Sequence, residues 1–162
     1  MAILVETSPL ISFLKVSRFD LLEQFGTPVC CTAEVIGEVL YFPQRDPLQA
    51  LLDAGKLLSV DLNHPDDLLD YVTLTTPPNP YGPGEVSSIL YAARNGVDLI
   101  ITDKKAIREA KKRKVTIMST QDVILRAIDS RILSVQDADD LISFWITLNE
   151  FPVEVKSFSE LR

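Results

Sequence analysis

The feature that most constrains the fold is the alternation of short apolar runs with stretches of helical periodicity. The runs are too short for helices, so each is predicted to be a buried strand, at residues 2–5, 29–32, 57–60, 97–102 and 115–118. Helical patterns begin at residue 7 or 8 and recur at 20–24, 33–41, 46–54, 66–72, 85–94, 104–113, 120–128 and 134–148. Such alternation typically buries a parallel sheet between two layers of helices. We therefore expect an α/β fold, a three-layer sandwich with a central parallel sheet of about five strands.

Capping residues mark where several of these helices begin. Thr7 or Ser8 is expected to cap the first helix, with Pro9 in its first turn. Thr120 is expected to cap the helix that ends at residue 128, and Ser134 the last long helix.

The chain is predicted to be a single domain over residues 1–162, because it contains no internal repeat and no low-complexity segment. Its one long loop-like stretch, the proline-rich segment 75–84, is too short for a domain linker and is typical of an active-site rim. The tail at 153–158 is expected to add an edge strand to the sheet.

Composition excludes several classes of protein. No apolar run approaches the ~20 residues of a membrane span, and the N-terminus lacks the basic region of a signal peptide. We therefore expect a cytoplasmic protein that does not interact with membranes. His64 is the only histidine, which excludes a mechanism with several histidines. Adjacent Cys30 and Cys31 make neither a disulfide framework nor a four-ligand zinc site, and are expected to be buried in a strand.

Four acidic residues are predicted to meet at one edge of the sheet. Glu6 follows the first strand and Asp103 the fourth, Glu38 lies on the helix after the second strand, and Glu85 opens the helix before the fourth. In an open parallel sheet, sites gather beyond the C-terminal ends of the strands. Clustered carboxylates repel one another, and a hard divalent cation, Mg²⁺ or Mn²⁺, would compensate their charge. Such a site suits the hydrolysis of phosphodiester bonds.

Each acid also has a purely structural interpretation. Asp103 could cap the helix that begins at Lys104, and Glu85 could stabilise the positive first turn of its own helix. Glu38 could be a solvated helix residue, and Glu6 a surface acid at a strand end. Spacing alone leaves the metal site and these structural roles open.

Four segments resemble motifs of PIN-domain proteins and occur in the order of that family. Residues 5–11, Val-Glu-Thr-Ser-Pro-Leu-Ile, resemble the opening Asp-Thr-Ser-Pro-Leu signature, and residues 33–39, Ala-Glu-Val-Ile-Gly-Glu-Val, the second acidic helix. Residues 81–89 resemble the Gly-x-Gly-Glu-x-x-x-Ile element, and residues 100–108 the strand that ends in Asp-Asp before a Lys/Arg helix. The resemblance covers about residues 3–120.

The resemblance implies a PIN-like fold and a metal-dependent ribonuclease acting on RNA. On the matching positions, Glu6, Glu38, Glu85 and Asp103 would be the catalytic and metal-binding acids, and Thr7 would support the first of them by a hydrogen bond. Many small bacterial members are VapC-type toxins that an antitoxin protein holds inactive, and they often form dimers. An antitoxin and a second copy of the chain are therefore the expected protein partners.

Two departures from the family pattern leave a second interpretation open. The first family acid is normally Asp, whereas Glu6 carries its carboxylate further out by about one C–C bond. The second acid of the Asp-Asp pair is replaced by Lys104, whose ammonium would neutralise the cluster in place of a second metal. The alternative is a catalytically silent PIN-like scaffold that binds RNA or a protein partner. A receiver-like phosphoacceptor domain fits less well, because it needs a close pair of acids after the first strand.

A basic helix follows the fourth strand in a chain whose net charge is -7. Five of its cations are predicted to hold RNA phosphates, the alternative being a solvated helix face: Lys105, Arg108, Lys111, Lys112 and Arg113. Tyr81, in the proline-rich loop, is expected either to pack within that loop or to stack on a base. Most apolar residues of the last helix are expected in the core, and Trp145 and its neighbours are also candidates for a homodimer contact.

Overall fold

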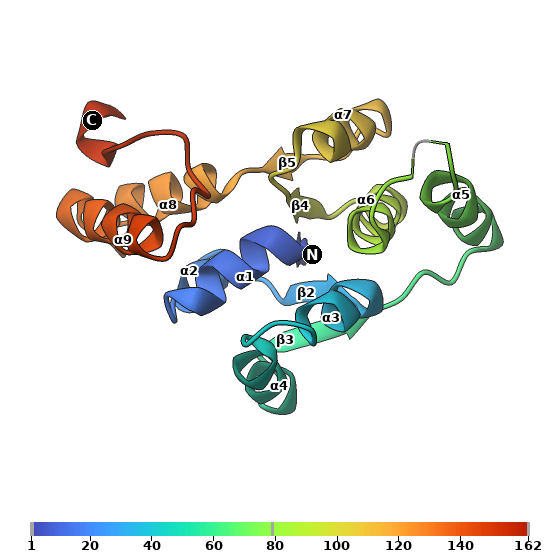
Figure 1. The fold of residues 1–162 in the computed structure, drawn as a ribbon, viewed down its shortest axis with the longest axis horizontal. Coiled ribbons are helices and arrows are strands. Elements are labelled where there is room, and N and C mark those ends of the chain that lie inside the picture. The colour runs from blue at the N-terminus through green and yellow to red at the C-terminus, as the bar shows by residue number, and fades with distance from the viewer. Residues whose placement is uncertain (1, 79, 162) are drawn as a thin grey trace.

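A parallel sheet of five strands runs through the middle of the molecule (Figure 1). The computed structural model describes residues 2–78 and 80–161. The strands lie in the order β3-β2-β1-β4-β5, with the bounds β1 (Ile3–Val5), β2 (Val29–Thr32), β3 (Leu57–Val60), β4 (Asp98–Ile100) and β5 (Ile117–Met118). β1 is central: Ile3 lies opposite Val29 of β2 and opposite Asp98 of β4. The predicted α/β fold with a parallel sheet of about five strands is confirmed.

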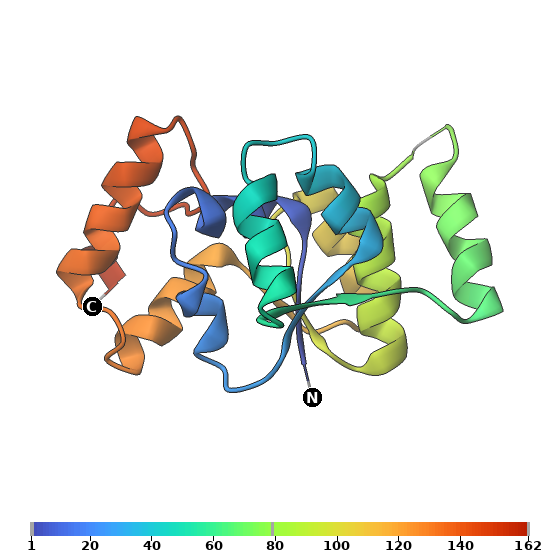
Figure 2. The same cartoon turned by 90° about the horizontal axis from the view of Figure 1, so that it is seen from below.

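Helices surround the sheet. Within the described residues they are α1 (Thr7–Lys15), α2 (Asp20–Glu23), α3 (Ala33–Val39), α4 (Arg45–Asp53), α5 (Pro65–Thr75), α6 (Pro83–Asn95), α7 (Lys104–Lys112), α8 (Thr120–Asp129), α9 (Val135–Thr147) and the 3₁₀ helix η1 (Phe158–Leu161). α5 and α9 lie at opposite ends of the molecule in both views (Figures 1 and 2). None of the described helices is long and apolar enough to cross a membrane.

Each face of the sheet carries its own apolar core, because successive strand residues point to opposite faces. In the larger core, Ile3 and Val5 pack with buried residues of α1, α2, α3, α8 and α9. In the smaller core, Leu4 packs with buried residues of α6 and α7. The free, buried Cys30 and Cys31 belong to the smaller and the larger core respectively. Helices therefore cover both faces, as the three-layer prediction required.

The topology of the sheet positions one edge for a site. From β1 the chain passes to β2 on one side, and it later enters β4 on the other side, so the strand order reverses between β1 and β4. Crevices open beyond the C-terminal ends of strands at such points. The backbone N–H of Glu6 donates to the carbonyl of Ile100 (3.0 Å), which joins the ends of β1 and β4. Residues that follow these two strands are thus brought to the same edge.

Two predicted helix caps are wrong by one or two residues. Glu6, rather than Thr7 or Ser8, caps α1, and its carboxylate accepts a hydrogen bond from the Ser8 backbone N–H (3.3 Å). Ser119, rather than Thr120, caps α8 through a reciprocal capping box. In both cases the capping residue precedes the first helical residue. Its extended backbone lets its side chain accept a hydrogen bond from a backbone N–H of the first turn. The predicted cap of the last helix, Ser134, is confirmed.

The tail does not add the edge strand predicted at 153–158. It packs against α9 instead, where Phe158 is buried in the larger core. The backbone N–H of Phe158 donates to the carboxylate of Asp139 (2.6 Å), and the Ser157 hydroxyl donates to the same group (2.8 Å). These hydrogen bonds hold the tail against α9. The tail does not pair with β5, which is only two residues long.

Trp145 is not available for the homodimer contact considered from the sequence. Its side chain is 1% exposed and packs edge-on against the ring of Phe13. Its Nε1–H donates to the backbone carbonyl of Ser12 (2.9 Å). Its neighbours Phe144 and Ile146 are exposed, so a contact between copies would have to use them instead.

Candidate active site

Three of the four predicted acids, Glu6, Glu38 and Glu85, line one hollow with a volume of about 390 Å³. They reach it from separate elements: Glu6 stands between β1 and α1, Glu38 lies on α3, and Glu85 lies on α6. The remaining lining consists of Thr7, Ser8, Tyr41, Phe42 and Gly82. Carboxylates that are far apart in sequence therefore face a common space at the predicted sheet edge.

Glu38 is held at both of its carboxylate oxygens. The Thr7 hydroxyl donates to Oε2 (2.5 Å), and the backbone N–H of Gly84 donates to Oε1 (2.7 Å). This clamp joins α1, α3 and α6, and it places a negative charge at the first turn of α6, where the helix dipole favours it. The Thr7 hydroxyl, expected to support Glu6, supports Glu38 in the structure.

A second set of hydrogen bonds fixes α3 against α6 behind this clamp. The buried Thr32 hydroxyl caps α3 by accepting from the Val35 backbone N–H (3.2 Å), and it also bonds to the Ser87 hydroxyl (2.8 Å). Ser87 donates in turn to the carbonyl of Gly84 (3.2 Å). These bonds fix the Gly84 backbone, whose N–H donates to Glu38.

The clamp requires glycine at position 84. A Cβ there would lie 2.6 and 2.8 Å from the two Glu38 oxygens and 2.8 Å from the Thr7 hydroxyl. These separations are well inside van der Waals contact, so the α6 backbone can approach the carboxylate only without a side chain. Gly84 is thus a site residue that the sequence analysis did not single out, although its position in the Gly-Pro-Gly-Glu segment was the available signal.

Glu6 is the most buried of the acids, with 4% of its surface exposed. The pKa of its carboxyl is raised from 4.5 to about 7, mainly by burial and also by the charges of Glu85 and Glu38. The backbone N–H groups of Ser8 and Thr7 act in the opposite direction, because they favour the charged form. This carboxyl therefore binds its proton more tightly than a solvent-exposed glutamate does.

Glu85 connects the hollow to the fourth acid, Asp103. Burial raises the pKa of Glu85, and the negative charge of Asp103 raises it further, so the two groups interact electrostatically. Asp103 does not line the hollow; it caps α7 by accepting from the Ala106 backbone N–H (2.8 Å). The structure thus places Asp103 beside the hollow and gives it the capping role that the sequence left open.

The cation beside the acids is Lys105 rather than Lys104. The charge of Lys105 lowers the pKa of Glu85, and its ammonium lies 4.2 Å from the centre of the Tyr81 ring. Lys104 is exposed and lines a different cavity together with Glu154 of the tail. Lys105, rather than Lys104, is therefore placed to neutralise the acids.

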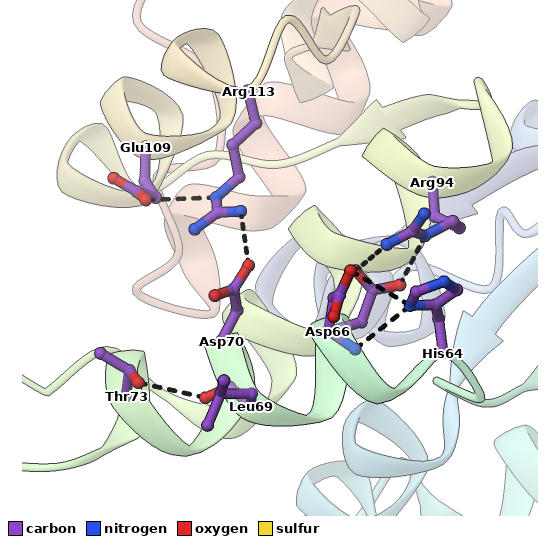
Figure 3. Close-up of polar contacts among 9 residues, drawn as sticks. His64, Asp66, Leu69, Asp70, Thr73, Arg94, Glu109 and Arg113 are labelled. Carbon is purple, nitrogen blue, oxygen red and sulfur yellow. Dashed lines mark hydrogen bonds and ion pairs between the residues drawn. The ribbon is translucent and has the colours of Figure 1, made fainter.

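The basic residues around α7 divide between structure and solvent. Arg113 forms ion pairs of 3.3 Å with Glu109 of α7 and with Asp70 of α5 (Figure 3). Arg113 thus joins α7 to α5, and it is the one of the five predicted RNA-binding residues with this structural role. The other four predicted RNA-binding residues, Lys105, Arg108, Lys111 and Lys112, are exposed. Among the described residues, neither Arg108 nor Lys111 has an acidic partner within ion-pair distance.

The donor set of the hollow matches a hard divalent cation in its chemistry, because its charged members are carboxylates. None of Glu6, Glu38 and Glu85 forms an ion pair within the part of the chain that the structure describes. The same residues do not present a preformed group of three or more metal ligands. Binding of an ion would therefore require the glutamate side chains to converge from their present positions.

Comparisons with known proteins agree with this fold. The sequence of residues 2–150 matches the model of a protein family described as PIN domain. A PilT N-terminus domain protein from the hyperthermophilic archaeon Sulfolobus solfataricus P2 has a similar structure, with a TM-score of 0.53 at 16% identity over 79% of this chain and 94% of that chain. No functionally curated protein matches the chain significantly. The chain belongs to the PIN-domain family, whose members are generally nucleases.

Gly84→Ala is expected to lower the free energy of unfolding by about 1–3 kcal/mol, the usual cost of overpacking, because the new Cβ must displace Glu38 and Thr7. Gly37→Ala is the matched control: it lies in α3 with no atom within 4 Å of the added Cβ, and should stabilise the protein by up to about 1 kcal/mol. Urea unfolding followed by circular dichroism measures both. Equal effects of the two substitutions would contradict the steric role of Gly84.

Glu6→Gln is expected to change how stability depends on pH. Because the pKa of Glu6 is raised in the folded state, the native protein binds this proton more tightly, and stability falls as pH rises from about 4.5 to about 7. The loss from this one group is about 3 kcal/mol above pH 7. The Gln variant should lack this part of the decline, and its amide oxygen can still accept from the Ser8 N–H.

Denaturant unfolding between pH 4.5 and 8 in the presence of EDTA measures the effect. Glu23→Gln, at an exposed acid of α2, is the control and should leave the wild-type pH profile unchanged. If the Glu6→Gln profile matched that of the wild type, the burial of an ionisable carboxyl at this position would be disproved.

Proposed function

We propose that this PIN-domain protein is a Mg²⁺- or Mn²⁺-dependent ribonuclease that hydrolyses phosphodiester bonds of RNA at the acid-lined hollow. The observation that carries the proposal is that Glu6, Glu38 and Glu85 line one hollow, while none of them has an ion-pair partner among the described residues. Structural acids normally find a cationic partner or face the solvent. A buried carboxyl with a raised pKa in a cleft is instead typical of a functional site.

The residues that would hold the cation are Glu6, Glu38, Glu85 and the adjacent Asp103. A bound divalent ion supplies charge neutralisation at the phosphate and activation of a water molecule. The protein's own contribution is positional: Thr7 and Gly84 orient Glu38, and the α1 cap orients Glu6. Glu6 must lose its proton to act as a ligand, so the affinity for the ion is expected to rise as the pH passes through about 7.

The exposed cations of α7 would bind the RNA backbone beside the hollow. α7 begins directly after Asp103, which places Lys105, Arg108, Lys111 and Lys112 on the helix that leads away from the acids. Lys112 shares Glu109 with Arg113, at 3.8 Å, so Arg108 and Lys111 are the more available partners for phosphates.

The biological role consistent with the family resemblance is the toxin of a toxin–antitoxin pair. Its partners would then be an RNA substrate, an antitoxin protein that blocks the hollow, and a second copy of the chain. Exposed Phe144, Ile146 and Leu148 at the end of α9 are the residues we propose for contact between copies.

A catalytically silent scaffold that binds RNA or protein is the second candidate. It is favoured by one specific observation, the lack of a preformed set of metal ligands among the described residues. The presence of Lys104 where the family has an acid also favours the silent scaffold. The two candidates differ in whether the hollow binds an ion at all.

Titration of the protein with Mn²⁺ by calorimetry, beside cleavage of a labelled single-stranded RNA, distinguishes them. The nuclease should bind Mn²⁺ saturably and cleave the RNA, and EDTA should stop the cleavage. Asp103→Asn should lower Mn²⁺ affinity at least about tenfold, as the loss of even an outer partner does. Asn is as good a helix cap as Asp, so α7 should remain folded.

The control is Asp137→Asn, which removes an exposed acid from the first turn of α9, on a helix that does not line the hollow. It should leave metal binding and cleavage unchanged. A folded wild type that neither binds Mn²⁺ nor cleaves RNA would support the silent scaffold, and full activity of Asp103→Asn would remove this residue from the mechanism.

The double substitution Arg108→Gln, Lys111→Gln should weaken RNA binding and reduce its salt dependence. Each cation removed from a phosphate of single-stranded RNA lowers the log–log slope by about 0.7, so the pair should lower it by about 1.4. Fluorescence anisotropy at several salt concentrations gives the slope. Lys56→Gln, Arg131→Gln removes two exposed cations outside α7 and is the charge-matched control. An unchanged slope in the α7 variant would identify that helix as a solvated face.

A further inference from the structure

The ring of Tyr41 is left free beside the acid-lined hollow. Tyr41 lines the hollow together with the three carboxylates, yet its side chain is 92% exposed. Phe42, next in the chain and also in the lining, is 45% exposed. Consecutive exposed apolar side chains at the rim of a hollow, here Leu40, Tyr41 and Phe42, form a patch of the kind that a binding partner covers.

A hydrogen-bonded turn of the backbone links Tyr41 to Glu38. The Tyr41 N–H donates to the carbonyl of Glu38 (3.3 Å), and the Phe42 N–H donates to the carbonyl of Val39 (2.9 Å). Residues three apart on a helical turn lie on the same face, with Cβ atoms about 5–6 Å apart. α3 has already ended at Val39, and Pro43 follows this turn. The ring therefore extends from a hydrogen-bonded turn, one helical step beyond the clamped carboxylate.

The other tyrosines near the site are already engaged. The ring of Tyr81, the stacking candidate from the sequence, carries the Lys105 ammonium at 4.2 Å from its centre. Tyr71 of α5 is partly buried, and burial together with the charges of Glu34 and Glu38 raises its pKa. Tyr41 is thus the tyrosine of this site with an open aromatic face.

We propose that Tyr41 is the platform on which an unpaired base of the RNA stacks, so that the adjoining phosphodiester is presented to the carboxylates. The inference rests on the proposed function for its substrate class. Stacking on an exposed ring tolerates any base, because every base has an aromatic face, and it requires that the base be unpaired. Tyr41 would be a positioning residue: it would set where along the strand the reacting phosphate lies, without taking part in the chemistry.

The shape and composition of the surface favour a base over a protein side chain. The free surface within the hollow consists of the planar rings of Tyr41 and, to a smaller extent, Phe42, whereas a peptide partner would also be expected to cover the exposed Leu40, which does not line the hollow. A base needs only the ring face and can leave its phosphate over the acids.

The test measures binding of a single-stranded RNA that contains 2-aminopurine, whose fluorescence falls when it stacks. Measurements in EDTA separate binding from cleavage. Tyr41→Ala should weaken binding about 5- to 150-fold, the range for loss of one base–aromatic stack, and should abolish the quenching. Tyr41→Trp should restore both. Phe151→Ala, which removes a 69% exposed aromatic ring outside the hollow lining, is the matched control and should bind like the wild type.

The outcomes separate this inference from the proposed nuclease function. RNA binding that depends on an aromatic residue at position 41, without any cleavage in Mn²⁺, would support the stacking role and reject the nuclease. Cleavage by the wild type together with normal binding and cleavage by Tyr41→Ala would overturn the stacking role and keep the nuclease. Failure of the wild type to bind RNA, or wild-type quenching in Tyr41→Ala, would also overturn it.

Discussion

The hydrogen-bonded clamp on Glu38 is the interaction on which the rest of the site depends. A carboxylate on α3 accepts one hydrogen bond from the Thr7 hydroxyl of α1 and one from the Gly84 backbone of α6. Three helices that are distant in sequence are thereby held at one end, where the sheet topology leaves a crevice. The close approach is possible because position 84 has no side chain, and because the Thr32–Ser87 hydrogen bond secures the α6 backbone from behind.

The clamp also explains how mutually repelling acids coexist in one place. Glu6 caps α1, Asp103 caps α7, and Glu38 sits on a backbone N–H in the first turn of α6, so each lies where a helix dipole is positive. The compensation is incomplete at Glu6, whose burial raises its pKa to about 7. The fold is therefore less stable with this carboxyl ionised than with it protonated, and any cation bound beside it would offset that cost. Stability and site chemistry are coupled through this one residue.

The parts of the fold set by local pattern were predictable, and the parts set by tertiary contacts were not. β2 and β3 have the bounds predicted from their apolar runs, and the edge that gathers Glu6, Glu38 and Glu85 follows from the alternation of strands and helices. The sequence could not show that the Thr7 hydroxyl turns to Glu38, because that choice depends on the distance between α1 and α3. It likewise could not show that Phe158 buries itself against α9 instead of extending the sheet.

The attachment of α5 shows how structural needs limit which charges remain for function. The buried face of this helix is polar: Asp67 is 7% exposed and forms two hydrogen bonds of 3.0 Å with Arg94 of α6, while Leu69 on the outer face is 67% exposed. Arg113 adds a link from α7 to Asp70 (Figure 3). One of the cations that hold this helix, Arg113, is among the five that the sequence analysis predicted to bind RNA. The run of basic residues therefore overstates the number of free cations on α7, where Lys105, Arg108, Lys111 and Lys112 remain exposed.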